Sequence, residues 1–131
     1  MTQQRRPVSA DRAPEALGPY SHAVAANGLL FCSGQVPIDP ETNELIDGGA
    51  ADQTRRCLDN LAAVCGSAGA QLTDAVRLTI YAVDLPGDWA EINEAYGTYF
   101  ADGPPARAAI GVAALPKSAR VEIDAIVALP D

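Results

Sequence analysis

Two stretches with helical periodicity, set among strand patterns, most constrain how this chain can fold. Apolar residues recur on one stripe between residues 51 and 68, and a second helical pattern runs from Asp88 to residue 100. Strand patterns precede the first helix, separate the two helices and follow the second. This order predicts an α+β sandwich with one mixed sheet of about six strands and both helices on one face.

The clearest turn signal is an Asn-Gly pair between two apolar runs. Asn27 and Gly28 separate residues 21–25 from residues 29–33, which predicts a tight β-hairpin. Residues 29–32 are continuously apolar, and this favours a strand that is covered on both faces. Residues 1–16 are polar and proline-interrupted, so we interpret them as a loose N-terminal arm that can contain a short edge strand.

Length and charge narrow the class of protein. The 131 residues suit a single domain, residues 1–131, with a real hydrophobic core. A formal net charge of -8 argues against a broad phosphate-neutralising surface, so we expect no nucleic-acid partner. No apolar run approaches the roughly 20 residues of a membrane span, and no apolar core follows the basic N-terminus. We therefore expect a cytoplasmic protein without a membrane partner.

The three cysteines do not predict a disulfide or a metal site. Cys57 and Cys65 fall on one predicted helix, about 12 Å apart along its axis, which exceeds disulfide reach. Cys32 lies in a predicted strand, and His22 is the only histidine. We interpret all three cysteines as buried apolar groups.

The most unusual candidate for function is an arginine in a strand of small residues. Residues 106–112 have strand character, so Arg107, Ala109 and Gly111 share one face, and the apolar residues between them suit a core. The small neighbours leave space beside a guanidinium, which can grip a planar carboxylate through two parallel hydrogen bonds. The alternative is a surface arginine whose head group lies in water.

A returning strand at residues 120–128 supplies candidate partners for Arg107. If residues 106–112 and 120–128 pair as a hairpin, Glu122 or Asp124 can lie on the Arg107 face, with a register that the sequence leaves open. A carboxylate there can pair with the arginine, handle protons beside a bound anion, or form an exposed polar edge. Too many apolar residues remain for the uncovered sheet face, which predicts a homo-oligomer.

Three further residues carry weaker signals. Gly34 ends a strand and fits either an ordinary turn or a close approach of the backbone to another group. Asn93 lies one step from the buried stripe of the second helix, where it can border a pocket or face solvent. Asp88, followed by Glu91 three positions later, predicts the N-terminal cap of that helix.

Several short motifs together resemble those of the RidA (reactive intermediate deaminase A, YjgF-type) family. They read G-P-Y-S-H-A-V at 18–24, F-C-S-G-Q-V-P at 31–37, P-A-R at 105–107 and L-P-K-S-A-R-V-E-I-D-A-I at 115–126. The resemblance implies a chorismate-mutase-like α+β fold and a homotrimer with ligand sites in three clefts between subunits. It also implies hydrolysis of reactive enamines and imines, such as 2-aminoacrylate, to 2-keto acids and ammonium without a cofactor or metal.

The same resemblance assigns roles to individual residues. Arg107 matches the arginine that holds the substrate carboxylate, and Glu122 matches the glutamate that positions or activates water. The positions that line the same cleft correspond to Tyr20, Ser33, Gly34, Asn93 and Ala109.

Two positions differ from the pattern of the family, and one of them, Ala109, lies just after the P-A-R motif. Ala109 stands where RidA proteins often have cysteine, so a thiol adduct cannot form there, and we expect water to attack the imine carbon directly. His22 lies in the first motif and is interpreted as structural.

Two classes of function remain open from the sequence. One is a deaminase acting on small imino acids, and the other is a non-catalytic trimer that binds small carboxylates such as 2-keto acids. A ribonuclease is disfavoured by the acidic charge balance and by the lack of an aromatic and basic strip.

Overall fold

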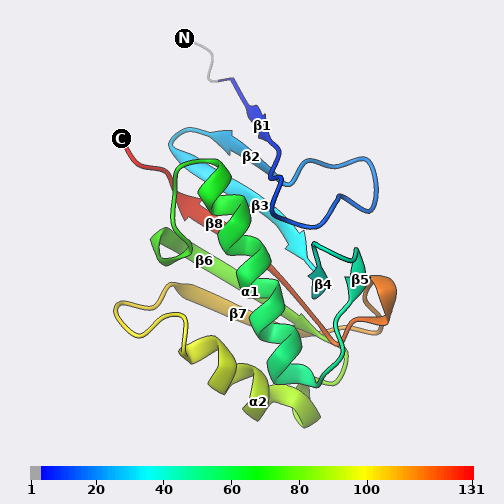
Figure 1. The fold of residues 1–131 in the computed structure, drawn as a ribbon. Helices are drawn as coiled ribbons and strands as arrows, with labels where there is room; N and C mark the ends of the chain where they lie inside the picture. Colours follow the sequence, from blue (N-terminus) through cyan, green and yellow to red (C-terminus); the bar gives the residue numbers. More distant parts are fainter. Residues whose placement is uncertain (1–3) are drawn as a thin grey trace.

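The computed structural model describes residues 4–131, and one mixed sheet of six strands organises them (Figure 1). The strand order is β1-β2-β3-β8-β6-β7. The bounds are β1 Arg6–Val8, β2 Ala23–Ala26, β3 Leu29–Gln35, β6 Ala75–Ala82, β7 Ala106–Gly111 and β8 Val121–Ala128. A separate pair consists of β4 (Ile38–Asp39) and β5 (Glu44–Leu45). The predicted α+β fold with about six strands is confirmed.

Two helices cover one face of the sheet, as Figure 1 shows. They are α1 (Ala50–Ser67) and α2 (Leu85–Gly97), with short 3-10 turns η1 (Leu72–Asp74) and η2 (Pro116–Ser118) elsewhere. The start predicted for α2 is wrong, because its N-cap is Asp84, whose Oδ1 accepts a hydrogen bond from the backbone N of Gly87. Asp88 is instead buried and bonded to Arg120.

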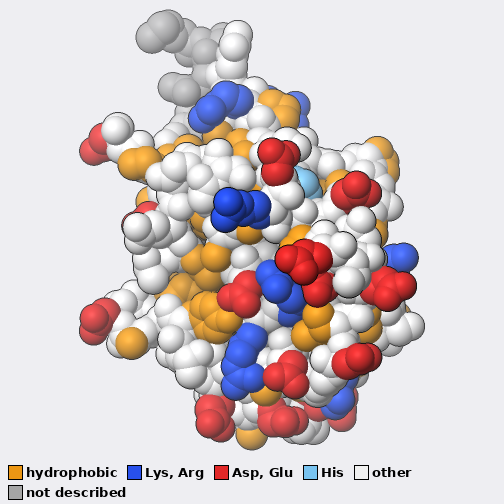
Figure 2. Space-filling view, viewed as in Figure 1, with side chains coloured by type: hydrophobic (Ala, Val, Ile, Leu, Met, Phe, Trp, Pro, Cys, Tyr) orange, Lys and Arg blue, Asp and Glu red, His pale blue; other side chains and the backbone are white. Residues whose placement is uncertain are grey.

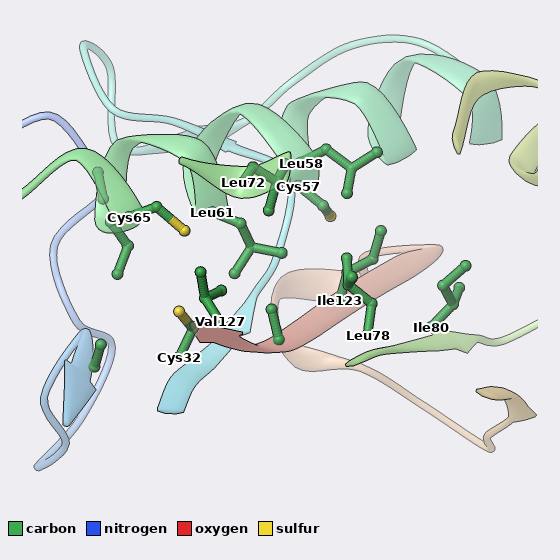
Figure 3. Close-up of a cluster of buried hydrophobic side chains, with 14 of the residues drawn as sticks. Cys32, Cys57, Leu58, Leu61, Cys65, Leu72, Leu78, Ile80, Ile123 and Val127 are labelled. Atoms are coloured by element: carbon green, nitrogen blue, oxygen red, sulfur yellow. The ribbon is translucent and has the colours of Figure 1, made fainter. Parts of the chain in front are cut away.

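The core lies between α1 and the sheet (Figure 3). Leucines of α1 meet apolar side chains of β8 and β6, among them Ile123 and Leu78. All three cysteines are buried and free, as predicted. The thiols of Cys65 on α1 and Cys32 on β3 face each other, and burial raises the pKa of the Cys57 thiol. These sulfurs therefore act as small core groups.

The N-terminal arm is anchored rather than loose within the described residues. β1 pairs with β2 as an edge strand, and Val8, Ala10 and Ala13 are buried. His22 fastens the arm, since its Nδ1 accepts from the backbone N of Ala10 and its Nε2 donates to the carbonyl of Pro14. These bonds support the structural interpretation of His22. Residues 1–3 lie outside the described part of the chain.

The pairing predicted for the last two strands is wrong. β8 lies between β3 and β6, with antiparallel pairing to both, and β7 runs parallel to β6 at the sheet edge. α2 is the crossover that joins β6 to β7, which a parallel pair requires. No hairpin therefore joins residues 106–112 to residues 120–128.

The face of the sheet opposite the helices carries exposed apolar side chains. Phe31 on β3 and Ile110 on β7 are 43% and 44% exposed. No helix of the described chain packs on Phe31, so one copy alone does not supply the cover expected on both faces of residues 29–32. The homo-oligomer expected to bury this face stays a prediction.

Candidate active site

Arg107 lies near the start of the edge strand β7 and faces α2. Its register partner on β6 is Leu78, which is fully buried on the helix side of the sheet. The Cζ of Arg107 lies 4.9 Å from the ring centroid of Trp89 and 4.9 Å from that of Tyr96. Its NH1 donates to Asn93 Oδ1 at 2.8 Å. The guanidinium is therefore held in a defined place although the residue is exposed.

A cavity of about 480 Å³ adjoins this guanidinium. It is lined by Asn93, Tyr96, Gly97, Phe100, Pro104, Pro105 and Arg107. Within residues 4–131, no carboxylate lies within 4.0 Å of Arg107, and the ion pairs found there involve other arginines. The cation is thus placed beside a cavity, without a carboxylate partner among residues 4–131. Neither Ala109 nor Gly111 lines this cavity, so the space expected over these two small residues stays a prediction.

Glu122 occupies a second cavity, of about 490 Å³. Its walls are Leu17, Gly18, Tyr20, Ser33, Gly34, Val36, Pro116 and Glu122. Three of the residues expected in the substrate cleft, Tyr20, Ser33 and Gly34, therefore surround the carboxylate of Glu122. The apolar walls from Leu17, Val36 and Pro116 were not among the predicted site residues, although Val36 and Pro116 lie within the motifs at 31–37 and 115–126.

Gly34 leaves the space that the Glu122 side chain fills. A Cβ at this position would lie 2.9 Å from Cδ of Glu122 and nearer still to Oε2. The pairing of β3 with β8 shifts register between Cys32 and Gln35, so Ser33 and Gly34 form an irregular step in the strand. Of the two interpretations of Gly34, close approach to another group is the correct one.

Neighbouring hydrogen bonds fix the walls of the Glu122 cavity. Ser33 Oγ donates to the carbonyl of Ser21 at 2.6 Å, which ties β3 to the segment before β2. The hydroxyl of Tyr20 accepts from the backbone N of Leu17 at 2.9 Å and folds the intervening loop back on itself. Both hydroxyls thus bond to backbone groups and fix the segments that form the walls of the cavity.

The environment of Glu122 favours its protonated form. Burial raises the pKa of this carboxyl above its usual value, and the nearby charge of Asp124 raises it further. Asp124 accepts a hydrogen bond from the hydroxyl of Tyr81 at 3.0 Å. A carboxyl with a raised pKa in a cavity exchanges a proton closer to neutral pH, as acid–base catalysis requires.

Arg107 and Glu122 lie on opposite faces of the sheet within one chain. Arg107 pairs with Leu78 of β6, whereas Glu122 pairs with Tyr81, three residues further along the same strand. An odd separation along a strand places side chains on opposite faces. The expectation that Glu122 or Asp124 shares the Arg107 face is therefore wrong, because it depended on the incorrect hairpin.

The remaining predicted site residues divide between the two regions. Asn93 lies with Arg107, as the hydrogen bond shows, and Ala109 follows two positions after Arg107 on the same side of β7. Trp89 and Tyr96 were not among the predicted site residues. The spacing of Trp89, Asn93 and Tyr96 indicates that they share one helix face, but not that this face meets Arg107.

We also searched the described residues for metal-binding groups and for membrane-spanning helices. Among residues 4–131, no group of three histidine, cysteine, aspartate or glutamate side chains is arranged to hold a metal ion. Neither α1 nor α2 has the length and apolar character needed to cross a membrane.

Comparison with known proteins matches this chain to one family over nearly its whole length. The sequence profile of the family described as Endoribonuclease L-PSP matches residues 10–129. Protein DfrA of Myxococcus xanthus is 48% identical over 124 residues, which cover 93% of this chain and 94% of that protein. The 2-iminobutanoate/2-iminopropanoate deaminase of Rattus norvegicus is 42% identical over 122 residues, covering 93% and 88% respectively.

The fold agrees with the sequence comparison. The crystal structure of RidA from the Antarctic bacterium Psychrobacter sp. PAMC 21119 has a TM-score of 0.90 and 40% identity, covering 95% of this chain and 99% of that one. The chain therefore belongs to the RidA family, which the Endoribonuclease L-PSP profile describes.

Proposed function

We propose that this protein is a homotrimeric 2-iminobutanoate/2-iminopropanoate deaminase. It hydrolyses reactive enamine and imine intermediates, such as 2-aminoacrylate and its imine tautomer, to 2-keto acids and ammonium. The single observation that carries the proposal is that the protein has both a carboxylate-binding group and an acid–base group at cavities. Arg107 lies beside one cavity without a carboxylate partner among residues 4–131, and Glu122, whose pKa is raised, lies in a second cavity.

Each active site is built from two copies of the chain. Arg107 and Glu122 lie on opposite faces of one sheet, so a single copy cannot direct both at one small substrate. The exposed apolar side chains of the open face, Phe31 and Ile110 among them, supply a surface on which another copy packs. In the trimer, the edge strand β7 of one copy lies over the Glu122 cavity of the next.

Arg107 binds the carboxylate that every imino acid substrate carries. The guanidinium presents further N–H groups besides the one that it gives to Asn93. Two parallel hydrogen bonds from such a group fix the plane of a carboxylate and hence the position of the adjacent imine carbon. Ala109 on the same side of the strand adds no bulk, which leaves room for a short substrate side chain.

Glu122 acts on the water that attacks the imine carbon. In its ionised form it takes a proton from water as the oxygen bonds to the carbon of the protonated imine, and the C=N π electrons move to nitrogen to give a neutral carbinolamine. The protonated carboxyl then gives this proton to the nitrogen, which leaves with the C–N electron pair as ammonia. As it leaves, the carboxylate takes the proton of the carbinolamine hydroxyl, so that the keto group forms, and this proton passes to ammonia to give ammonium. General acid–base help of this kind is worth about 10²–10⁴ in rate, which suits a substrate that already hydrolyses in water.

The raised pKa of Glu122 supports this double role. A carboxyl with an ordinary pKa remains ionised near neutrality and returns a proton poorly, whereas burial moves Glu122 toward the range in which both forms are populated. No step uses a thiol, so Ala109 in place of the family's frequent cysteine is compatible with the mechanism.

Binding of RNA is disfavoured despite the family's ribonuclease name. Figure 2 shows acidic and basic side chains interspersed on the helix-covered face, without a continuous basic surface. The formal charge of -8 opposes phosphate binding in general.

The proposal is tested by coupling the protein to a pyridoxal-phosphate enzyme that releases 2-aminoacrylate from serine. We expect faster release of pyruvate when the wild-type protein is added, and no acceleration when the Arg107→Ala variant replaces it. If the wild type binds pyruvate but does not accelerate its release, the protein is a carboxylate-binding trimer, and the deaminase proposal is rejected.

A further inference from the structure

We propose that Trp89 and Tyr96 form an aromatic clamp that positions the Arg107 guanidinium for the substrate carboxylate. The inference rests on the proposed function in taking a small carboxylate as the ligand of Arg107. It assigns a positioning role to two residues that touch the arginine and not the reacting atoms. The clamp consists of Trp89, Tyr96 and the acceptor Asn93.

The geometry of the clamp comes from one face of α2. Trp89, Asn93 and Tyr96 follow one another at intervals of four and three residues, which places them on a single side of a helix. Both aromatic ring centroids lie 4.9 Å from Cζ of Arg107, well within the range of a cation–π contact. Asn93 Oδ1 accepts from NH1 and fixes the rotation of the guanidinium about its last bond.

The two ring contacts and the hydrogen bond to Asn93 leave N–H groups of the guanidinium for a ligand. Aromatic rings contact the flat face of a guanidinium, whereas carboxylates bind its N–H edge. Asn93 is the one hydrogen-bond acceptor found for Arg107 within residues 4–131. The remaining N–H groups are therefore available to a carboxylate, and their direction is set before the ligand arrives.

A clamp is needed because of where Arg107 lies. β7 is the edge of the sheet, and its residues are mostly exposed, so backbone packing alone leaves a long side chain free to rotate. Binding would then have to order the arginine as well as the ligand, which weakens affinity. The aromatic contacts order it in advance.

The ring of Tyr96, and not its hydroxyl, performs this role. Tyr96 is 4% exposed, and its ring packs against Phe100 with centroids 4.8 Å apart. Its buried hydroxyl has no hydrogen-bond partner in the described chain. Tyr96→Phe should therefore keep the clamp, whereas Tyr96→Leu should remove one side of it.

The experiment compares aromatic and aliphatic replacements in the full-length protein. Affinity for pyruvate, which is an unreactive keto acid, is measured by calorimetry, and KM and kcat are measured in the coupled assay. We expect Trp89→Leu and Tyr96→Leu each to weaken pyruvate binding and raise KM by roughly 5- to 10-fold, the size of one lost cation–π contact. Trp89→Phe and Tyr96→Phe should stay within about 2-fold of the wild type, because Phe also provides a π face.

A matched control lies just beyond the end of the same helix. The Tyr99 hydroxyl donates to Asp59 Oδ1 at 2.8 Å, with the carbonyl of Arg55 at 3.2 Å, and its ring is not one of the two found over Arg107. Tyr99→Leu should leave KM and pyruvate affinity unchanged to within about 2-fold. An equal loss in Tyr99→Leu and Trp89→Leu would show a general effect of helix packing and would overturn the clamp.

A spectroscopic readout keeps the test independent of variant stability. In the wild type, the Arg107 Nε–H resonance, assigned by its loss in Arg107→Lys, should show the ring-current shift of a proton held over aromatic rings. The shift should shrink in Trp89→Phe and disappear in any soluble Trp89→Leu protein. An unshifted resonance in the wild type contradicts the clamp.

Failure of the clamp and failure of the proposed function give different results. If the wild type binds pyruvate but lacks deaminase activity, the deaminase proposal fails, and the affinities still decide the role of the clamp. If pyruvate affinity is the same in Trp89→Leu, Tyr96→Leu and the wild type, the clamp is rejected whether or not the enzyme is active.

Discussion

The Glu122 region and the Arg107 region differ in how the fold holds a functional side chain. Glu122 stands on β8, which is paired on both sides, and its carboxylate fills the space left by Gly34. Arg107 stands on an edge strand and is held by side chains of α2 instead. A central strand fixes an acid through backbone pairing, whereas an edge strand offers a cation to another molecule and needs side-chain support.

The largest expected effect comes from removing the cation. Arg107→Ala should abolish detectable pyruvate binding and lower kcat/KM by about 10²–10⁴-fold, because two charge-assisted hydrogen bonds are lost. Calorimetry and the coupled assay measure the two quantities. Retained binding would mean that Arg107 does not hold the carboxylate.

Removing the acid should separate chemistry from binding. Glu122→Gln should lower kcat by about 10²–10⁴-fold, the usual contribution of acid–base catalysis, while pyruvate affinity changes little. Single-turnover rates and calorimetry on the same preparation give both values. An active Glu122→Gln protein would remove this residue from the mechanism.

The same variant has a second readout in stability. The folded-state pKa of Glu122 is raised, so its contribution to stability falls as pH increases through that pKa. A Gln side chain does not ionise, so the Glu122→Gln variant does not lose this stability as the pH rises. The stability of Glu122→Gln relative to the wild type should therefore increase with pH, as thermal unfolding in acidic and neutral buffer will report.

Backbone support of the acid is tested at Gly34. A Cβ there overlaps the Glu122 side chain, so Gly34→Ala should displace the carboxylate and lower kcat by about 10²-fold, as small misplacements of catalytic groups do. Gly66→Ala on α1 is the matched control, because a Cβ there meets nothing within 4 Å. The control should keep full activity and gain roughly 0.5–1 kcal/mol of stability. Equal activity of the two variants would refute the close approach.

A smaller effect, on stability, is expected from breaking the contact of Asp88 with Arg120. This aspartate, next to Trp89 on α2, is 3% exposed and is bonded to the Arg120 guanidinium. Arg120→Ala should cost about 1–3 kcal/mol in chemical unfolding, because a buried charge loses its partner. The exposed pair of Arg55 with Asp52 is the control, and Arg55→Ala should cost no more than about 1 kcal/mol. Similar costs for both would contradict the structural role of Asp88.

The sequence predicted the parts of the fold that local patterns determine. The Asn27-Gly28 turn, both helices and the strand character of residues 106–111 follow from residue type and periodicity. The pairing of β7 and β8 could not be read this way, because β6 enters between them from a distant part of the chain. Asp88 resembled a helix cap locally, but a buried bond to Arg120 decides its role.

The sequence predicted individual residues of the candidate site, but not how they are arranged in space. Arg107, Glu122, Gly34 and Asn93 do border cavities, which the resemblance and the local spacing indicated. Their division between two faces depends on sheet register, and a one-step change in register exchanges the faces. Trp89 and Tyr96 were missed as partners of Arg107 because an aromatic stripe on a helix is usually core.

The most direct test of the shared site is to mix two inactive variants. Arg107→Ala and Glu122→Gln subunits, co-expressed in equal amounts with different tags, should assemble into mixed trimers. If each site takes Arg107 from one copy and Glu122 from the next, about a quarter of the sites regain both groups, and the activity should return to about that fraction of wild type. Mixed trimers that remain as inactive as either variant alone would contradict a site shared between copies.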